Sequence, residues 1–562
     1  MTSTREIITL QFGNYANYVG AHWWNIQESG FSYDPNGEPS EIDHDVLYRE
    51  GVDYKGQVTY TPRLLLVDLK GALQHLPELG TLYESEPSTS AAASTSDRLE
   101  SVQSSIPWDS EGVEVIKKEP QVKPEFQKDL DDPHVDITEK DYDFSTNAKT
   151  WSDFLYARYH PRTINIVKNY QHSDSVNSFD TFSNGSRIWQ NEYYEDDFGD
   201  KIRQYMEECN NCQGFQTIFD CANGFGGLSL KCLEYLNDEY SKVNLAVPVF
   251  NPRSVLFENS DEPLANSICV VNTALVYSHL VEQSSLIVPL STADRAWRQI
   301  GAPRHFPLLN YKSDNLYQTS AILASFLDTI SLRYRLKNPV SSCYLSNFCS
   351  DLNNYGRKLT AAALGLPFSM RSDEDLIDCL DKLEGSMFTQ ISPNSKIGTD
   401  YIVQSACIRG IPKNRLKRPS KQAQRQMKMA AYKCESVSEM LQLYFQCSNH
   451  ASLAHVSAVE APHPVKIPYP MEMFDPRLNF EGFLEDINRI EDQKLISVPV
   501  VATVQCSGDL SDTLESLHRE ASRIKLSKIH RFKETGLESD EYVEVLEHLL
   551  NFKDNYDDNF DL

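Results

Sequence analysis

A glycine-rich loop is the stretch of this sequence whose residue types best suit a chemical task. The loop, residues 222–227, reads Ala-Asn-Gly-Phe-Gly-Gly and follows an apolar run, Phe215–Cys221, that predicts a buried strand. After it, Leu230 and Leu233 begin a helical spacing of apolar residues. A strand, a glycine loop and a helix in this order can bring backbone amides at a helix N-terminus up to a phosphate. The alternative is a tight turn in which glycine supplies a positive φ.

Two other segments are predicted to reach the same edge of a sheet. Ile7–Phe12 reads as a strand that ends at Gly13 and Asn14, and Leu64–Val67 reads as a strand with Asp68 near its carboxyl end. Ligands of open α/β sheets bind at the carboxyl ends of the strands. The alternation of strands and helices predicts an α/β fold with a doubly wound sheet.

Other catalytic and metal-binding patterns are weak in this sequence. Cys209 and Cys212 form the one CxxC among twelve cysteines, so reduced thiols are the simpler interpretation. His450, His455 and His463 have no cysteine or carboxylate at ligand spacing, and the two prolines beside His463 predict a surface loop. The sequence has no Walker-type lysine loop, HExxH or GxSxG. We assign no metal.

The composition limits the class of protein. A chain of 562 residues can bury a large core and should form two or three domains. A net charge of −27 and a pI near 4.9 argue against a nucleic-acid binder, which would present basic surface to phosphates. No stretch approaches the roughly twenty apolar residues of a membrane span, so any membrane association is expected to be peripheral.

Residues 85–149 are predicted to be a disordered, acidic, low-complexity insertion. Ser88–Ser96 contains only Ser, Thr and Ala, and the following acidic stretch has no periodic apolar face. Lys117 and Lys123 lie in aliphatic-Lys-x-Glu patterns that resemble sumoylation acceptors. A solvated run of charges is the favoured interpretation of both.

The remaining elements include a central helix and an unusual basic stretch. Apolar spacing predicts a core helix over 317–332, and 495–504 reads as a strand in which Pro499 favours an edge position or a break. The stretch 409–433 contains basic residues and no acidic one: Arg409, Lys413, Arg415, Lys417, Arg418, Lys421, Arg425, Lys428 and Lys433. It is either a solvated surface or a site that attracts an acidic partner.

Several short motifs, in a shared order, resemble tubulin. They are Arg5-Glu6-Ile7, Gln213-Gly214-Phe215-Gln216 before the glycine loop, Tyr60-Thr61-Pro62-Arg63, and a strand ending in Arg409-Gly410. With Trp23-Trp24 near the start, the chain looks most like the Misato family of tubulin/FtsZ-related proteins.

The resemblance implies a Rossmann-type GTPase-like domain (1–84 and 150–335, with a central helix at about 315–332) and a second α/β domain (336–505). C-terminal helices and an acidic tail (506–562) complete the expected organisation.

A tubulin-like fold implies a guanine-nucleotide pocket, and this sequence departs from that pattern. The candidate vestigial pocket for GTP or GDP comprises Gly13, Asn14, Asp68, Asn223, Gly224, Gly226, Gly227, Tyr311 and Asn315, with the last two at tubulin's YxxxN spacing. Phe225 replaces the threonine of the tubulin loop, and Tyr355 and Lys358 stand where its catalytic loop has carboxylates. GTP hydrolysis by the tubulin mechanism is therefore not expected.

The Misato resemblance implies a non-catalytic protein of mitochondrial distribution and morphology and of mitotic spindle and microtubule organisation, including chromosome segregation. It implies tubulin or microtubules and the cytosolic chaperonin as partners. The expected locations are the cytoplasm, the mitochondrial outer surface and the spindle. Two alternatives remain: a GTP-binding switch, and an active GTPase that assembles into filaments.

Overall fold

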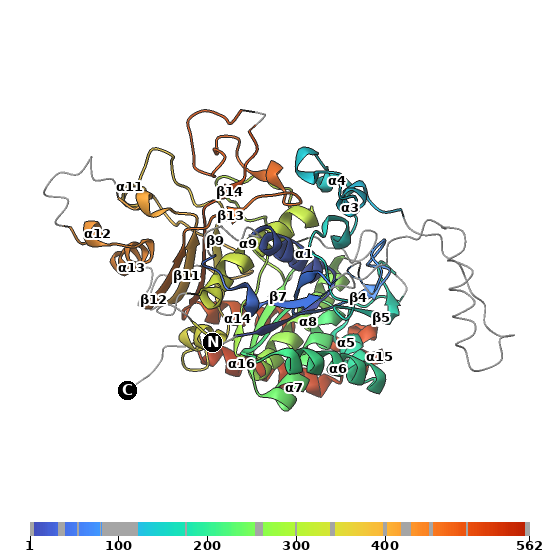
Figure 1. Cartoon of the computed structure of the whole chain (residues 1–562). Helices are drawn as coiled ribbons and strands as arrows, with labels where there is room; N and C mark the ends of the chain where they lie inside the picture. Colours follow the sequence, from blue (N-terminus) through green and yellow to red (C-terminus); the bar gives the residue numbers. More distant parts are fainter. Residues whose placement is uncertain are drawn as a thin grey trace, which may run out of the picture.

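In this computed structural model, apolar strands in the first half of the chain build one parallel sheet (Figure 1). The structure describes residues 5–31, 40–52, 56–78, 80, 82, 122–174, 177–252, 262–297, 300–337, 343–396, 402–417, 429–448, 453–490 and 493–556. The predicted low-complexity run, Lys117, His450, residues 418–428 of the basic stretch and residues 557–562 of the acidic tail lie outside these residues.

The first sheet has six parallel strands in the order β5-β4-β1-β6-β7-β8. They are β1 (Ile7–Phe12), β4 (Leu64–Lys70), β5 (Ile164–Gln171), β6 (Gly214–Asp220), β7 (Val243–Val249) and β8 (Leu286–Ile287). β1 and β6 are buried along their whole length, as expected for central strands covered on both faces. The predicted doubly wound sheet is confirmed.

Helices cover both faces of this sheet, because its strands carry apolar side chains on both sides. On one face lie α1 (Asn14–Ser29) and α9 (Leu316–Arg335). On the other lie α5 (Phe182–Trp189), α6 (Glu192–Glu208), α7 (Gly224–Tyr240) and α8 (Glu262–Gln283), followed by the C-terminal α14 (Leu510–Ser522), α15 (His530–Glu534) and α16 (Ser539–Asp554).

α8 corrects one prediction. Its segment Leu264–Gln283 is long and apolar enough, by length and composition, to cross a membrane. In this fold 67% of the most apolar window is buried, and α7, α14 and α16 pack against the helix. In this fold α8 is a core helix.

The second sheet is mixed, with the order β10-β9-β15-β11-β12. Its strands are β9 (Ala361–Gly365), β10 (Thr389–Gln390), β11 (Val403–Arg409), β12 (Leu453–Val459) and β15 (Val500–Cys506). Pro499 precedes β15, so the predicted break is confirmed, but the predicted edge position is wrong because β15 pairs with both β9 and β11. α9 packs on one face; α11 (Leu376–Asp381), α12 (Ala430–Lys433) and α13 (Val437–Cys447) pack on the other.

The predicted core helix over 317–332 is α9, and it lies between the two sheets. The smaller elements are β2 (Tyr48–Val52), β3 (Val58–Pro62), β13 (His463–Pro464), β14 (Ser497–Val498), α3 (Glu125–Asp131), α4 (Phe144–Asn147) and α10 (Leu345–Leu352), with 3-10 turns at 44–46, 137–139, 151–154, 413–415, 471–473 and 526–528.

The prediction of disorder for residues 85–149 is wrong for its last part. Residues 122–149, which we call the strap, contain α3 and α4 and follow the surface beside α1 (Figure 1). Phe126 is buried and packs edge-on against Phe144. The strap has no periodic apolar pattern in its sequence, and contacts between aromatic side chains hold it in place.

Candidate functional site

The turn after β1, the end of β4 and the loop after β6 meet at the carboxyl edge of the first sheet. Gly13 N–H donates to Val67 O at 3.0 Å, and Asn17 Nδ2 donates to Asp68 Oδ2 at 2.9 Å. Gly13 has φ 109°, and a Cβ there would lie 2.5 Å from Asp220 Oδ2. Gly13, Asp68 and the glycine loop therefore share one edge, as predicted; nucleotide binding there stays a prediction.

Asp220, which the sequence analysis did not single out, occupies the N-terminus of α1. Its Oδ1 accepts from Ala16 N–H at 2.8 Å and its Oδ2 from Tyr15 N–H at 3.2 Å. These are the kinds of amides that hold an anion at a helix N-terminus. Burial raises the pKa of Asp220 to about 7, against the lowering effect of the two N–H donors, and Asp68 adds a further upward shift.

The amides of the glycine loop are also satisfied within the chain. Gly224 N–H donates to Phe179 O at 3.2 Å. Asn223 is the N-cap of α7, and its Oδ1 accepts from Phe225 N–H at 2.9 Å. Gly226 N–H donates to Asn223 O at 3.1 Å. The Phe225 ring packs edge-on against Phe179. A phosphate at this loop would have to displace these partners.

The glycines of the loop allow α5 and α7 to approach each other. A Cβ on Gly185 of α5 would lie 1.7 Å from Gly224 O, and a Cβ on Gly227 would lie 2.0 Å from Phe182 O. Such contacts of a Cβ with a backbone oxygen are sterically forbidden. Close helix packing thus accounts for Gly227 without a ligand.

Asp68 points inward and is fully engaged. Asn17 Nδ2 and Trp151 Nε1 each donate to its Oδ2 at 2.9 Å, and Leu69 N–H donates to its Oδ1 at 2.8 Å. Burial raises its pKa. Asn14, at the first position of α1, is half-buried, and its Oδ1 has no hydrogen-bond partner among the described residues.

Tyr311 and Asn315 lie at the N-terminal end of α9, where their polar atoms are engaged with the protein. The Asn315 side-chain oxygen caps α9 by accepting from Tyr317 N–H at 3.0 Å, and its Nδ2 donates to Ser145 O of the strap at 2.8 Å. Tyr311 Oη donates to Arg304 O at 2.7 Å. The hydrogen-bonding groups that the resemblance assigns to guanine are thus used for capping and for holding the strap.

The loop aligned with tubulin's catalytic loop places no carboxylate at the two substituted positions. Tyr355 is 83% exposed and has a left-handed φ of 57°. The Lys358 ammonium donates to Val281 O, and burial lowers its pKa. The alignment itself stays a prediction.

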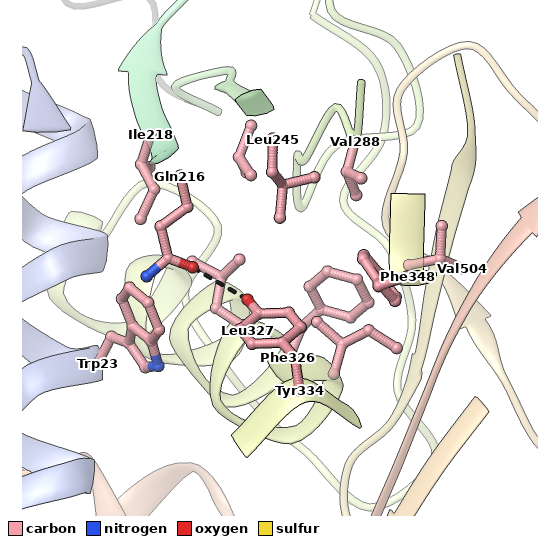
Figure 2. A pocket seen from close by; sticks show the side chains of 12 residues that line it. Trp23, Gln216, Ile218, Leu245, Val288, Phe326, Leu327, Tyr334, Phe348 and Val504 are labelled. Atoms are coloured by element: carbon pink, nitrogen blue, oxygen red, sulfur yellow. Dashed lines mark hydrogen bonds between the residues drawn. The ribbon is translucent and has the colours of Figure 1, made fainter. Parts of the chain in front are cut away.

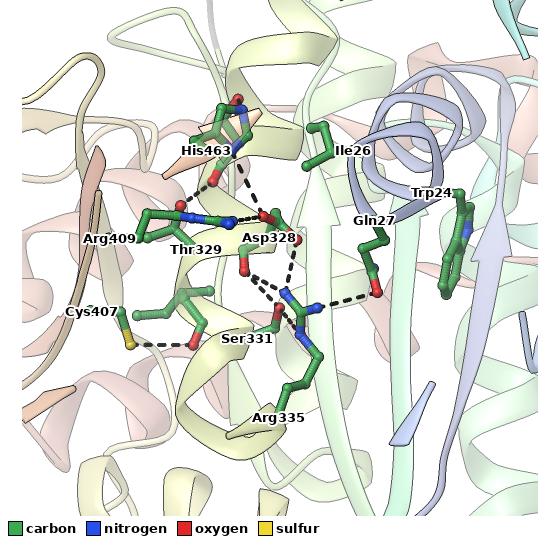
Figure 3. A network of polar contacts seen from close by, with 12 residues as sticks. Trp24, Ile26, Gln27, Asp328, Thr329, Ser331, Arg335, Cys407, Arg409 and His463 are labelled. Atoms are coloured by element: carbon green, nitrogen blue, oxygen red, sulfur yellow. Dashed lines mark hydrogen bonds and ion pairs between the residues drawn. The ribbon is translucent and has the colours of Figure 1, made fainter. Parts of the chain in front are cut away.

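A buried ion cluster connects α9 to the second sheet (Figure 3). Arg335 Nη2 lies 2.8 Å from Asp328 Oδ1, Arg409 of β11 pairs with Asp328 Oδ2, and His463 Nδ1 lies 3.8 Å from the same oxygen. Burial would raise the pKa of Asp328, but Arg409 and Arg335 outweigh it and hold the pKa well below its ordinary value. Burial also lowers the pKa of His463.

This cluster corrects two predictions. His463 is fully buried, not in a surface loop, because β13 pairs with β14 and turns its imidazole towards α9. Arg409 is buried too, so it adds nothing to a basic surface.

Three further basic residues in the described part of this stretch are also engaged by the protein. Lys413 lies 2.9 Å from Glu460, and the Arg415 guanidinium lies over the Phe483 ring. Lys417 donates to the carbonyl oxygens of Tyr432 and Cys434 at 3.0 and 2.8 Å. The residues between, 418–428, lie outside the described part, so a basic surface there stays a prediction.

A cavity of about 20 Å³ lies between α9 and the first sheet, far too small for a nucleotide (Figure 2). Trp23, Leu245 and Phe348 are among its lining residues, and Tyr334 Oη donates to Gln216 Oε1 at 2.9 Å beside it. A volume of this size has room for about one water molecule.

In the described part of the chain, no three His, Cys, Asp or Glu side chains gather as metal ligands would. Cys209 is half-exposed and Cys212 is buried. His455 Nδ1 lies 3.9 Å from Asp351 Oδ2.

Comparison with known proteins identifies tubulin-like domains in this chain. A family model described as the Misato Segment II tubulin-like domain matches residues 5–132, and a tubulin-domain model matches residues 143–336. Among similar proteins, protein misato of Drosophila melanogaster is 43% identical, with 99% of both chains covered. Protein misato homolog 1 of Homo sapiens is 31% identical, with 98% of both covered. Protein dml1 of Aspergillus clavatus is 34% identical over 59% of this chain and 60% of its own.

Proposed function

Because this chain belongs to the Misato family and has tubulin-like domains, we propose that it is a non-catalytic tubulin-like protein that acts by binding other proteins. It serves mitochondrial distribution and morphology, and mitotic spindle and microtubule organisation with chromosome segregation. Its partners are tubulin or microtubules and the cytosolic chaperonin. It resides in the cytoplasm, at the mitochondrial outer surface and at the spindle.

One observation supports the non-catalytic part most strongly. The amides that a nucleotide's phosphates would need are already bonded to groups of the chain. Asp220 accepts at the N-terminus of α1, and Phe179 O and Asn223 accept at the glycine loop. Displacing a buried carboxylate and a backbone carbonyl would leave them without partners, at a cost of about 1–3 kcal/mol for each neutral group and more for a charged one.

The direct test is the nucleotide content of the protein purified in native form. The protein is denatured, and the released small molecules are separated against GTP and GDP standards. We expect no guanine nucleotide and no uptake of added GTP. Near-stoichiometric GTP or GDP would contradict the proposal and favour the GTP-binding switch, with Tyr311 and Asn315 the first residues to replace.

The cellular part is tested by depletion and rescue. Loss of the protein should alter mitochondrial distribution and disturb spindle assembly, and wild-type protein should restore both. The Phe225→Ala variant, which removes a side chain that packs against Phe179, should rescue as well as wild type if it accumulates normally. Unchanged mitochondria and spindles after depletion would contradict the proposed roles.

A further inference from the structure

The strap is held like a docked peptide. Its helix α4 has only four residues, and a helix this short is not stable in water on its own. Its conformation therefore depends on what it touches. The strap touches the rest of the chain in more than one place. Gln127 of α3 donates through its Nε2 to Leu155 O at 2.7 Å. Residues 141–145, with the sequence Asp-Tyr-Asp-Phe-Ser, contact the N-terminal end of α9 and Lys494.

Basic side chains of the body receive the acidic residues of this motif. Lys494 Nζ lies 2.9 Å from Asp141 Oδ1 and also donates to Thr138 O at 3.5 Å. Asp143 caps α4 by accepting from Thr146 N–H, and the charge of Lys312 lies near it.

An aromatic contact and three polar contacts hold the centre of the motif. The Phe144 ring packs against Tyr317, the second residue of α9, at 5.5 Å between centroids. Asn315 Nδ2 donates to Ser145 O at 2.8 Å, and Gln318 Nε2 donates to Ser145 Oγ at 3.2 Å. Ser145 Oγ in turn donates to Glu472. The N-terminal turn of α9 thus contacts both the backbone and the side chains of residues 141–145.

We propose that this surface, formed by Lys312, Asn315, Tyr317, Gln318 and Lys494, is a docking site for a short acidic peptide with an aromatic residue. Residues 141–145 are its intramolecular occupant, and a partner protein presents the same chemistry to it. A tethered occupant competes at high effective concentration, so the partner binds when the strap leaves. The inference rests on the proposed function in one respect: Asn315 serves the strap rather than a guanine.

The test uses the full-length chain and a fluorescently labelled peptide of residues 137–149. In the double variant Asp141→Ala, Phe144→Ala the strap loses its charged and aromatic contacts, and we expect saturable binding by fluorescence anisotropy. Wild type should bind at least tenfold more weakly, because its own strap fills the site. Adding Lys494→Glu to the double variant should weaken binding at least tenfold.

A matched control keeps the result specific. Asp136→Ala removes an exposed strap carboxylate that accepts hydrogen bonds from the backbone and the hydroxyl of its neighbour Thr138, and it should behave as wild type. The second measurement is limited proteolysis, which should cut the strap faster in the double variant than in wild type or Asp136→Ala.

Three outcomes would overturn the proposal. If the double variant binds neither peptide nor labelled GTP, the result contradicts the docking site and leaves the proposed non-catalytic function intact. If it binds GTP and not the peptide, the strap closes a nucleotide pocket, and both the docking site and the proposed function fall. Equal peptide binding by wild type and double variant would likewise remove the strap from the site.

Discussion

Asp220 places a carboxyl group of the chain itself at the N-terminus of α1, a kind of position that can hold an anion. The partial positive charge of the α1 N-terminus stabilises the carboxylate, while its complete burial opposes ionisation. Burial prevails, so the pKa lies near 7. The group therefore changes charge within the physiological range.

A pH dependence follows from this pKa. An acid whose pKa is raised from 3.8 to about 7 on folding binds its proton more tightly in the folded state. Its contribution to stability is then present below the unfolded value and is lost as pH rises through the folded value. Asp220→Asn removes this titration. The stability advantage of wild type over the variant should shrink by on the order of 2 kcal/mol between pH 5 and pH 8.

Denaturant unfolding at several pH values measures this difference. Asp238→Asn, which removes an exposed carboxylate on α7, serves as the matched control. A wild-type advantage over Asp220→Asn that stays constant with pH would show that Asp220 does not titrate in this range.

At the residue level, the sequence predicted where polar groups gather but not which of them contact each other. Gly13, Asp68 and the glycine loop were found because the carboxyl ends of parallel strands share an edge. Asp220 was missed because it continues an apolar run and reads as the end of a strand. The sequence did contain one signal for it: Asp220 is an acidic residue at the carboxyl end of β6, and the neighbouring strand β1 leads directly into α1. The contact of Gly224 N–H with Phe179 O could not be predicted, because every residue has a backbone carbonyl whatever its type.

The packing of α5 on α7 depends on glycine at the contact. Gly185→Ala would place a Cβ 1.7 Å from Gly224 O, so the helices must separate. We expect destabilisation of about 3 kcal/mol, at the upper end for overpacking. In the matched control Gly51→Ala, the nearest atom is the Thr59 hydroxyl at 3.3 Å, and the change should be small. Thermal unfolding of both variants measures the difference, and equal melting temperatures would contradict the close approach.

Elements with a strong period were predictable, and those held by scattered contacts were not. α9 and β6 carry continuous or periodic apolar residues, and both are present. The strap has aromatic residues at irregular spacing, Phe126, Tyr142 and Phe144, which become a cluster only when the chain folds back. β15 lies mid-sheet because Pro499 precedes it and no ladder hydrogen bond is lost.

At the scale of the whole molecule, the cluster around Asp328 joins the central helix to the second sheet. Arg409→Ala would remove one of its two arginine partners in a fully buried site, and we expect a loss of about 3–5 kcal/mol. Lys413→Ala, only four residues away, removes an exposed ion pair with Glu460 and should cost far less than Arg409→Ala, because solvent screens the pair. Urea unfolding followed by circular dichroism compares the two. Similar losses for both would mean that the buried cluster adds little.

The overall α/β class followed from the alternation of strands and helices and from the tubulin resemblance. The return of the C-terminal helices to the first sheet did not follow from any local pattern, because α14 and α16 are amphipathic helices that fit many apolar surfaces. α8 and these two helices are separated by a long stretch of sequence and come into contact only when the chain folds.

That separation has a consequence for the newborn chain on the ribosome. α8 emerges with an apolar side that α14 and α16 later cover. Translation of the stretch between Gln283 and Leu510 takes roughly 10–45 s at about 5–20 residues per second. During this interval the apolar side of α8 stays uncovered, and a chaperone that binds apolar segments has time to bind it.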